Sequence, residues 1–400
     1  MKESFYISCN LGFEETLAQE IRQCWPQLIE INGQANQSPL PELTLEMGGV
    51  LVKTSFELGL QFNFFLKTAH RVLWRIAEFK VRDFPKLFEK VQKITWGNYL
   101  KGRKIEWVVA ASKSRLNNEK RIEETCGEAF AKVAAKVQGE SLAPQAVYVR
   151  IYEDLCTLSL DSSGENLYKR GWGTLKGEAP LRETLAAFLI QEMMQDAPPN
   201  KTQQVTVVDP MCGSGTLILE AAGLWQPVFE RKFSFLDWKN TPKIFRSSLL
   251  KKNYKLLQKQ APFKSYLGYD IDEKVLAAAE ENQKSLESKM DVKNLKIRFE
   301  KENLFKGEKK NLGPVWCITN PPYGERLHVQ GRDSRDQEAF SYQDLLQRMA
   351  DKFSAEKIGV LLPNKRSVKS LKAPEGYKKR KEIPFSNGGL EVVYMIYRKK

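Results

Sequence analysis

The pattern of apolar and polar residues predicts that strands and helices alternate along most of the chain. Near the N-terminus, the apolar runs "FYISCN" and "GGVLVKT" are typical of strands, and the segment between them places Phe13, Leu17 and Ile21 at helical spacing. These form a small α+β unit; further on, helical segments alternate with strands in an order that forms a second, α/β unit too short for a full Rossmann domain. We therefore expect two small domains, at residues 1–60 and 61–163.

A third, larger domain is predicted for residues 164–400, with a Gly- and Ser-rich connection at 162–180. There the helix-like "LRETLAAFLIQEMM" precedes the strand-like "QQVTVVD", which runs into "PMCGSG" and the helix-like "TLILEAAGLW". Strand, Gly-rich turn and helix in this order open a doubly wound parallel sheet, so the expected fold class is α/β. Further strands are expected at "SYLGYDID", "LKIRFEKEN", "VWCITN", "KIGVLLP" and "LEVVYMIYRK", and a charged helical insertion is expected at 229–255.

The charge of the chain favours a polyanionic partner. Its 400 residues include 63 Lys and Arg against 49 Asp and Glu, a formal net charge of +14. Nucleic acid is favoured over a membrane surface, because the sequence contains no basic amphipathic helix with a long apolar face. The candidate clusters for contact with nucleic acid are Lys101 to Lys104, Lys113 to Arg115, Lys169 and Arg170, Lys251 and Lys252, and Lys378 to Lys381.

Cysteine and histidine usage excludes several kinds of chemistry. The six cysteines lie singly, without a C-x-x-C pair, which indicates reduced thiols in a cytoplasmic protein rather than a disulfide framework or a zinc site. With only two histidines, His70 and His328, a three-histidine metal centre is excluded and a histidine relay is disfavoured. No apolar signal core precedes the first charges, and no apolar stretch reaches the roughly 20 residues of a membrane span. We expect a cytoplasmic protein with no metal and no membrane partner.

The turn "DPMCGSGT" (209–216) is the first candidate ligand site. A nucleoside triphosphate loop would need a Lys after the last glycine, and a dinucleotide fingerprint would need an acid about 20 residues on; Gly213, Gly215 and the distant Asp270 fit neither. S-adenosylmethionine suits such a turn, because glycines clear space for its methionine end and Asp209 can meet its ammonium group. A plain strand-to-helix turn remains the alternative.

Two acids follow the next predicted strand, in "SYLGYDID". Asp270 ends that strand, at the place where such sheets hold an acid against ribose hydroxyls. Asp272 is explained by a local role as the N-cap of the helix "EKVLAAAEENQ". We therefore assign ribose binding to Asp270 and helix capping to Asp272.

The motif "NPPY" at 320–323 follows a strand-like run and is the candidate for catalysis. Its two prolines remove two backbone donors and stiffen the peptide, so its oxygen acceptors are held rigidly outside the strand. The Asn320 side-chain oxygen and the Pro321 carbonyl can accept the two N–H bonds of an exocyclic base amine, which orients the nitrogen lone pair and offsets developing positive charge. Tyr323 offers a flat face for a base taken out of its stack. A rigid strand terminator without a ligand is the alternative.

These motifs carry a family resemblance. The segments "DPMCGSGTLILEAA", "GYDID" and "NPPYGERL", preceded by "LYKRGW" and "APLRETLAA", closely resemble the THUMP-domain RNA guanine-N2 methyltransferases, among which the bacterial 23S ribosomal RNA enzymes are nearest. The resemblance covers nearly the whole chain. "NPPY" also marks adenine-N6 and glutamine methyltransferases, but its combination with "LYKRGW" is a strong signal.

The resemblance implies a fold, a cofactor and a set of site residues. A ferredoxin-like domain (1–60) and a THUMP domain (61–163) would bind RNA, and a Rossmann-like domain (164–400) would bind S-adenosylmethionine. Implied cofactor contacts are Asp209, Pro210, Met211, Cys212, Gly213, Ser214, Gly215, Thr216, Asp270 and Ile271, and the implied base-binding loop is Asn320, Pro321, Pro322 and Tyr323. Secondary candidates are Arg182, Glu183 and Thr184, whose helix could equally be packing. Where relatives hold an Asp and a small residue near adenine, this chain has Glu302 and Asn303.

Several functions stay open at this point. The first is guanine-N2 methylation of a structured RNA, with 23S ribosomal RNA ahead of transfer RNA. An adenine-N6 DNA methyltransferase would share the loop chemistry but would not explain the front half of the chain. A non-catalytic RNA-binding module is disfavoured by the intact Asp209 and Asn320. The target nucleotide and the oligomeric state are not encoded in any motif of the sequence.

Overall fold

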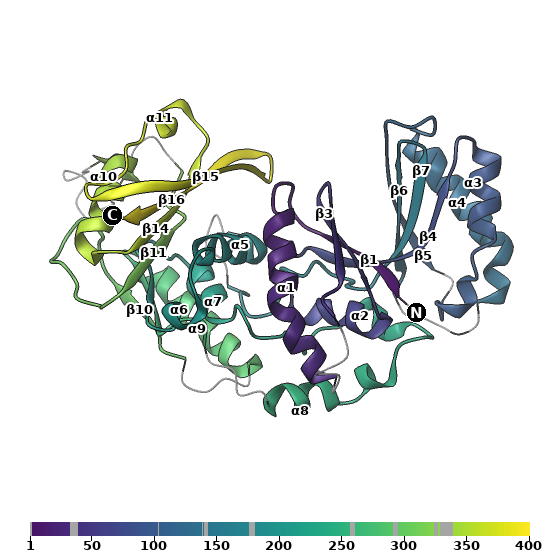
Figure 1. Ribbon diagram of the computed structural model, residues 1–400, viewed down its shortest axis with the longest axis horizontal. Helices are drawn as coiled ribbons and strands as arrows, with labels where there is room; N and C mark the ends of the chain where they lie inside the picture. The colour runs from purple at the N-terminus through teal and green to yellow at the C-terminus, as the bar shows by residue number, and fades with distance from the viewer. Residues whose placement is uncertain are drawn as a thin grey trace. The chain divides into compact units, whose positions relative to one another are not determined.

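The computed structural model describes residues 2–32, 39–102, 104–137, 139, 143–175, 181–256, 261–290, 295–323, 327–328 and 339–400. The chain forms two compact units, whose elements are labelled in Figure 1. Unit 1 contains Met1–Leu167 and Pro227–Gln258, and unit 2 contains Tyr168–Gln226 and Lys259–Lys400. The chain therefore leaves unit 1, begins unit 2, returns to unit 1 and then completes unit 2. The division of unit 1 into separate ferredoxin-like and THUMP domains stays a prediction.

Unit 1 is built on a seven-stranded sheet of order β2-β3-β1-β4-β7-β6-β5. Neighbouring strands pair antiparallel except β5 and β6, which are parallel. Along β6, buried and half-exposed residues alternate, as expected for a sheet with one face in the core. The strands are β1 (Glu3–Ser8), β2 (Glu42–Glu46), β3 (Gly49–Thr54), β4 (Arg71–Lys80), β5 (Ile105–Ser112), β6 (Gln145–Tyr152) and β7 (Leu155–Asp161).

Helices pack against this sheet in two pairs. The helices α1 (Glu14–Ile31) and α2 (Phe56–Phe65) contact each other and β3, whereas α3 (Phe84–Gln92) and α4 (Glu119–Val133) lie side by side near β5 (Figure 1). Side-chain caps fix where three of them begin, because the oxygen of Ser55, Asp83 or Asn118 accepts a free amide of the first turn. Short 3-10 turns occupy Trp96–Asn98 and Ala134–Lys136.

Residues 227–258 lie between two strands of unit 2 in the sequence but pack within unit 1. The charged helical insertion expected at 229–255 is not one continuous helix: the segment forms η3 (Ser234–Asp237), η4 (Lys243–Arg246) and the short helix α8 (Leu249–Leu256). The rings of Phe233, Phe235 and Phe245 surround Phe64 of α2, with centroid distances of 4.8, 6.1 and 6.0 Å. Phe233 and Phe235 are buried and Phe245 is half-buried, so aromatic packing contributes much of the apolar contact that holds the segment in unit 1.

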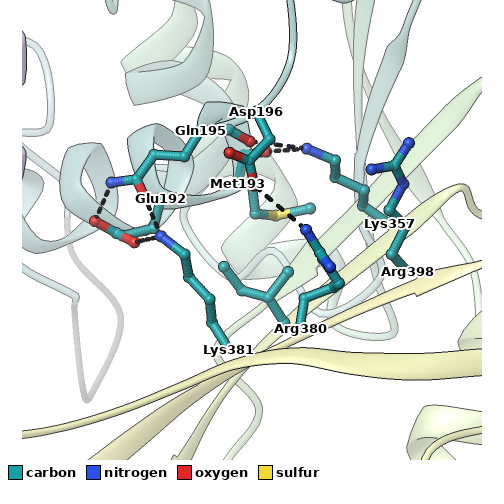
Figure 2. Close-up of a pocket in the computed structure, with 9 residues that line it drawn as sticks. Glu192, Met193, Gln195, Asp196, Lys357, Arg380, Lys381 and Arg398 are labelled. Carbon is teal, nitrogen blue, oxygen red and sulfur yellow. Dashed lines mark hydrogen bonds and ion pairs between the residues drawn. The ribbon is translucent and has the colours of Figure 1, made fainter.

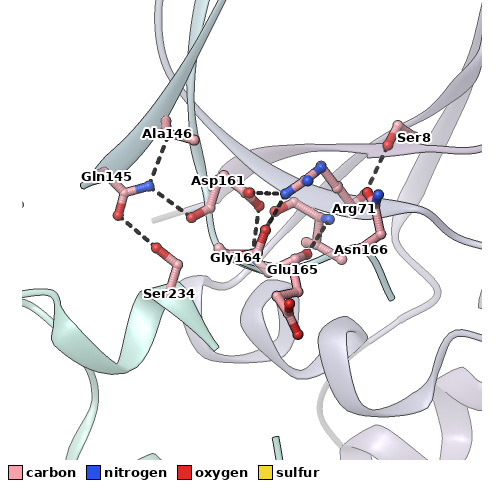
Figure 3. Close-up of polar contacts among 12 residues, drawn as sticks. Ser8, Arg71, Gln145, Ala146, Asp161, Gly164, Glu165, Asn166 and Ser234 are labelled. Atoms are coloured by element: carbon pink, nitrogen blue, oxygen red, sulfur yellow. Dashed lines mark hydrogen bonds and ion pairs between the residues drawn. The ribbon is translucent and has the colours of Figure 1, made fainter. Parts of the chain in front are cut away.

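Polar contacts also hold unit 1 together at the ends of its strands (Figure 3). The Gln145 side-chain oxygen accepts a hydrogen bond from the Ser234 hydroxyl at 2.9 Å, which ties the inserted segment to β6. Asp161, the last residue of β7, accepts from the Arg71 guanidinium and from the Ser163 amide, the latter at 2.8 Å. Arg71 also donates to the Gly164 carbonyl. The buried carboxylate of Asp161 is therefore paired within its own unit.

Unit 2 is built on a second seven-stranded sheet, of order β10-β9-β8-β11-β14-β16-β15. The first five strands in this order are parallel, and β16 is antiparallel to both β14 and β15. The strands are β8 (Thr206–Asp209), β9 (Ser265–Asp270), β10 (Ile297–Lys301), β11 (Val315–Thr319), β14 (Lys357–Pro363), β15 (Tyr377–Asn387) and β16 (Leu390–Lys399). The expected α/β class with a Rossmann-like sheet is confirmed.

Helices cover both faces of this sheet. On one face α5 (Glu183–Met194) and α9 (Glu273–Lys289) flank α7 (Thr216–Ala222), and the Tyr394 hydroxyl of β16 donates to the Leu189 carbonyl of α5 at 2.9 Å. On the other face α10 (Tyr342–Phe353) buries Leu345 and Met349 against alternate residues of β11 and β14. The remaining elements are α6 (Pro199–Thr202), α11 (Arg366–Lys369) and the strand pair β12 (Leu327–His328) and β13 (Ala339–Phe340). Among the described helices, none is both long and apolar enough to cross a membrane.

Candidate active site

Three parallel strands of unit 2 bring residues that are distant in sequence to one edge of the sheet. β8 ends at Asp209, β9 ends at Asp270, and β11 ends at Thr319, directly before Asn320. β8 lies between β9 and β11. Because the carboxyl ends of parallel strands meet at the same edge, these residues face the crevice where open α/β sheets bind ligands.

The Gly-rich turn at 209–216 is fastened to the neighbouring strand. The Cys212 amide donates to the Tyr269 carbonyl at 2.9 Å, and the Gly213 amide donates to Asp270 Oδ2 at 2.9 Å. The turn that sequence reasoning singled out and the acid assigned to the next strand are thus in direct contact.

The absence of a side chain has a different structural role at each of two glycines in the turn. Both lie in the left-handed region, with φ of +52° at Gly213 and +84° at Gly215. A Cβ atom at Gly215 would approach the Phe299 ring to 2.8 Å, so Gly215 is required for packing. A Cβ atom at Gly213 would meet nothing within 4 Å. The space beside Gly213 is therefore open, next to the Asp270 carboxylate, as a bound cofactor would need.

Asp209 is a buried carboxyl group without a cationic partner among the described residues. It is 2% exposed, and it accepts a hydrogen bond from the Met211 amide at 3.1 Å. The Thr319 hydroxyl faces it without reaching hydrogen-bond geometry. Burial raises the pKa of Asp209 to about 7, and the nearby Asp270 carboxylate adds to the rise. A bound ammonium group would stabilise the ionised form and reverse this shift.

Asp270 organises the end of β9. Its Oδ1 accepts the Asp272 amide at 3.0 Å while its Oδ2 holds Gly213. Asp272 accepts the Lys274 amide at 2.8 Å and begins α9, so the predicted capping role is confirmed. Ile271 between them is 40% exposed, an apolar side chain left open beside the acid. The ribose contact of Asp270 and the cofactor contact of Ile271 stay predictions.

Residues 168–175, which we call the strap, are held against α7 by a buried ion pair. Arg170 Nε lies 2.9 Å from both carboxylate oxygens of Glu220, and both side chains are 1% exposed. Trp172 donates its indole N–H to the same carboxylate at 3.1 Å. Glu220 was not among the predicted site residues, although a charge inside the apolar run "LILEAA" is a signal of a buried pair.

A second contact fastens the strap to the Gly-rich turn. Asn282 of α9 accepts the Leu175 amide at 3.0 Å and donates to the Leu175 carbonyl at 2.8 Å. The same amide group donates to the Ser214 carbonyl at 3.2 Å. Asn282 on α9 therefore helps to position the Gly-rich turn. No feature of the sequence pattern indicated this role.

The start of α5 lies next to the turn. A small pocket is lined by Glu183, Ser214 and Thr216 together with residues of the strap. Thr184 is buried, and Arg182 places its guanidinium 5.9 Å from the centre of the Tyr168 ring. The structure thus brings the secondary candidates of the α5 start close to the Gly-rich turn, and their cofactor contacts stay predictions.

Glu302 and Asn303 have local partners. The Glu302 carboxylate forms ion pairs with Lys310 at 2.6 Å and with the buried Lys352 at 2.7 Å, and the lysine contacts lower its pKa against the effect of burial. The Asn303 side chain accepts the Phe305 amide at 2.9 Å. These contacts give both residues a structural role, and a contact with adenine stays a prediction.

The "NPPY" loop presents one buried acceptor and one exposed ring. Asn320 Oδ1 is buried and has no hydrogen-bond partner within the described part of the chain. Pro321 is buried, whereas Pro322 is exposed. Tyr323 is 40% exposed, and partial burial raises the pKa of its hydroxyl to about 12, so it stays protonated at neutral pH. Residues 324–326 of the motif lie outside the described residues.

Other kinds of chemistry find no support at this edge. No group of three metal-ligating side chains occurs among the residues that the structure describes. Burial raises the pKa of the Cys212 and Cys317 thiols well above the ordinary value, so neither is a ready thiolate nucleophile.

Comparison with known proteins identifies the family. Residues 170–392 match the family UPF0020, described as "RMKL-like, methyltransferase domain". The matched region is more than half of the chain and contains the Gly-rich turn, Asp270 and the "NPPY" loop.

Curated relatives match a larger part of the chain. It is 29% identical over 340 residues to the "Putative RNA methyltransferase YpsC" of Bacillus subtilis, an alignment that covers 82% of this chain and 80% of the relative. It is 27% identical over 413 residues to the "Ribosomal RNA large subunit methyltransferase K/L" of Marinobacter nauticus, covering 99% of this chain and 53% of the relative. The chain thus spans about half the length of this K/L relative.

Solved structures share the fold over the whole chain. "A possible methylase from Clostridium difficile 630" superposes with a TM-score of 0.77 at 25% identity and covers 100% of this chain and 99% of its own. "SMU.472, a putative methyltransferase complexed with SAH" superposes with a TM-score of 0.75 at 23% identity, covering 100% and 98%. With this fold and with the family match over its Gly-rich turn and "NPPY" loop, the chain belongs to the RMKL-like methyltransferase-domain family.

Proposed function

We propose that the protein is an S-adenosylmethionine-dependent methyltransferase that modifies the exocyclic N2 amine of a guanine in structured RNA, with 23S ribosomal RNA as the substrate. The observation that carries this proposal is Asn320 Oδ1, a buried oxygen acceptor without a partner in the described chain, at the carboxyl edge of the sheet. A buried acceptor without a hydrogen-bond donor costs free energy. Its presence at a ligand-binding edge therefore indicates that a bound ligand supplies the donor.

An exocyclic base amine is the donor that this loop suits. Its lone pair is delocalised into the ring, so it is a poor nucleophile until its two N–H bonds are held and the lone pair is directed out of the ring plane. Asn320 Oδ1 and the Pro321 carbonyl would accept these N–H bonds, and their partial negative charge would stabilise the positive charge that develops on nitrogen. No strong base is required, which agrees with the neutral Tyr323 and thiols of this edge.

The residues of the Gly-rich turn fit a cofactor with a cationic end and a ribose. S-adenosylmethionine supplies, when bound, a methyl group activated by a positive sulfur. Asp209 would hold the ammonium group, the open space beside Gly213 would admit the cofactor to the backbone, and Asp270 would accept the ribose hydroxyls. The family match and the relative solved with SAH, the demethylated product of this cofactor, support the same assignment.

Three observations support RNA as the substrate. The net charge of +14 favours a polyanion. The Bacillus subtilis and Marinobacter nauticus relatives are named as an RNA methyltransferase and a ribosomal RNA methyltransferase. The exposed Tyr323 ring offers a stacking face for a flipped base. A protein that methylates ribosomal RNA would act in the cytoplasm, where that RNA is found.

The test is methyl transfer from tritiated S-adenosylmethionine to deproteinised 23S ribosomal RNA, transfer RNA and genomic DNA in parallel. We expect label in the ribosomal RNA, and we expect nucleoside digestion to give N2-methylguanosine. The same assay with Asn320→Ala serves as the control for the site, and its label should fall to background under these conditions. N6-methyladenine in DNA, or full transfer by the Asn320→Ala protein, would overturn the proposal.

A further inference from the structure

A second polar pocket lies in unit 2 at the opposite edge of the sheet from Asn320 (Figure 2). Lys357 is the first residue of β14, and the loop that carries Asn320 follows β11 at the other end of the same pair of strands. The end of α5 and the strands β15 and β16 complete the pocket. Its lining residues are Glu192, Met193, Gln195, Asp196, Lys357, Arg380, Lys381, Ile396 and Arg398.

The pocket carries more positive than negative side chains. Lys381 is neutralised by Glu192 at 2.9 Å, and Arg380 lies 3.7 Å from the exposed Asp196. The Arg398 side chain is exposed and forms no hydrogen bond or ion pair with any described residue, and Figure 2 draws it beside Lys357 without a dashed line. The acids of the pocket thus leave Lys357 and Arg398 uncompensated.

Lys357 is the buried member of this group. It is 8% exposed, donates to the Met193 carbonyl at 2.6 Å, and lies 4.2 Å from the centre of the Trp316 ring. Burial and the neighbouring Arg398 lower its pKa to about 8; Lys201 and Arg380 act in the same direction, and Asp196 opposes them. The bond to Met193 caps the end of α5, which explains one cation in the pocket but not the others.

The strand register sets like charges directly opposite one another. Arg398 on β16 pairs with Lys357 on one side and with Lys378 on the other, so three cations form a row across three strands. Like charges in directly opposite positions destabilise a sheet. Charged residues on the edge strand β15 protect it from pairing with other chains, but that role needs no cations on the inner strands β14 and β16. An anion in the pocket would relieve the repulsion.

We propose that this pocket binds a phosphate group of the RNA backbone, as a contact of unit 2 separate from the base-binding loop. This inference rests on the proposed function in taking RNA as the substrate. The cavity has a volume of about 60 Å³, and no aromatic ring lines it, so it suits a single anionic group and not a base. Such a contact orients the RNA without reading its sequence.

The test compares Arg398→Gln with Lys399→Gln, which removes the same charge one residue further along β16, on the opposite face of the strand and outside the pocket. For each protein the dissociation constant for 23S ribosomal RNA is measured over a range of salt concentrations. Loss of one phosphate contact lowers the log–log slope by about 0.7 to 0.9. We expect this decrease for Arg398→Gln and a smaller one for Lys399→Gln, with S-adenosylmethionine affinity unchanged in both.

Two outcomes would overturn the proposal. One is an equal change of slope in the two variants, which would make Arg398 an ordinary surface charge. The other is thermal stabilisation of the wild-type protein by inorganic phosphate that Arg398→Gln abolishes while its RNA slope stays that of the wild type, which would make the pocket a site for a free anion. Failure of the proposed function would appear differently, as absence of methyl transfer to RNA by the wild-type protein.

Discussion

Asp161 in unit 1 and Asp209 in unit 2 are two buried aspartates, and each is the last residue of a strand. Burial raises the pKa of both, to about 6 for Asp161 and about 7 for Asp209. Asp161 faces the Arg71 guanidinium, which opposes the rise, whereas Asp209 faces a second acid, Asp270, which adds to it. Among the described residues, the aspartate at the end of the strand therefore has a cationic partner in unit 1 and lacks one in unit 2.

This difference indicates which buried polar groups are candidates for ligand binding. Burial of a charge is common to both sheets and does not mark a site. Of the two aspartates only Asp209 lacks a cationic partner among the described residues, and Asn320 Oδ1 at the same edge has no donor there. We expect the ion pair of Asp161 to matter for folding, and Asp209 and Asn320 to matter for ligand binding.

The largest effect is expected when the pair in unit 1 is broken. Arg71→Met leaves Asp161 buried without its cation, and removal of one partner of a buried ion pair costs roughly 3–5 kcal/mol of unfolding free energy. The folded-state pKa of Asp161 is about 6 with Arg71 present and should rise further without it, so the two proteins differ most above about pH 6, where wild-type Asp161 is ionised beside its cation. The loss, measured by chemical unfolding, should therefore be larger at pH 8 than at pH 5.

The matched control for this prediction is Arg82→Met. Arg82 pairs with Asp154 at 2.9 Å but is 65% exposed, so its loss should change stability little. Equal losses in the two variants would show that Asp161 does not depend on Arg71.

A smaller effect, on catalysis instead of stability, is expected at Asn320. Asn320→Ala should lower kcat by about 10² to 10³, or about 2.7–4 kcal/mol, as for loss of one preorganised electrostatic group. Thermal stability and cofactor affinity should stay near the wild-type values, because the removed oxygen has no partner in the described chain. Asn320→Asp keeps oxygen acceptors and should retain more activity than Asn320→Ala. A single-turnover rate near that of the wild type in Asn320→Ala would contradict the acceptor role.

Aromatic rings extend the comparison between the units. The rings around Phe64 in unit 1 are packed together, whereas Tyr323 in unit 2 is 40% exposed. Tyr323→Ala should weaken RNA binding by about 1–3 kcal/mol, the value of one stacked base, and Tyr323→Phe should be mild because it keeps the ring. Filter binding of RNA measures the effect. Equal losses in both variants would assign the role to the hydroxyl group instead of the ring.

The smallest effect concerns the protonation of Asp209. With a pKa of about 7, the ionised form that suits an ammonium group is a minor species at pH 6 and dominates at pH 7.5. Cofactor affinity should therefore rise about eightfold between these pH values. Asp209→Asn should bind more weakly with a flat pH profile. Calorimetry at the two pH values measures the change, and an unaltered pH dependence in Asp209→Asn would exclude Asp209 as its source.

Prediction from the sequence succeeded where an apolar run ends abruptly at a polar residue. The strands that end at Asp209, Asp270 and Thr319 lie where the pattern placed them, because buried parallel strands are nearly continuous apolar runs. The pattern missed β2 and β15, which are edge strands with mostly exposed residues. The lysines of β15 were interpreted only as a basic cluster, since an edge strand needs no apolar stripe.

Contacts between distant residues were beyond the reach of sequence patterns. Arg170 and Glu220 are 50 positions apart, and only the fold shows that the strap rests on α7. The sequence pattern of 229–255 did not show that the segment breaks into short helical pieces, because Phe233, Phe235 and Phe245 pack on Phe64 in a different part of the chain. Local periodicity reports propensity, and tertiary packing decides between propensities of similar strength.

The return of residues 227–258 to unit 1 has a consequence for the order of events during synthesis. Domains usually fold as units from the N-terminus while the ribosome is still adding residues. Here the aromatic partners of Phe64 are added only after β8 and α7 of the next unit have been made. The aromatic contacts of Phe64 therefore cannot form, and apolar surface of unit 1 stays exposed, until part of unit 2 has left the ribosome. A gene divided at the apparent boundary near residue 164 would separate unit 1 from its residues 227–258 and leave that segment attached to unit 2.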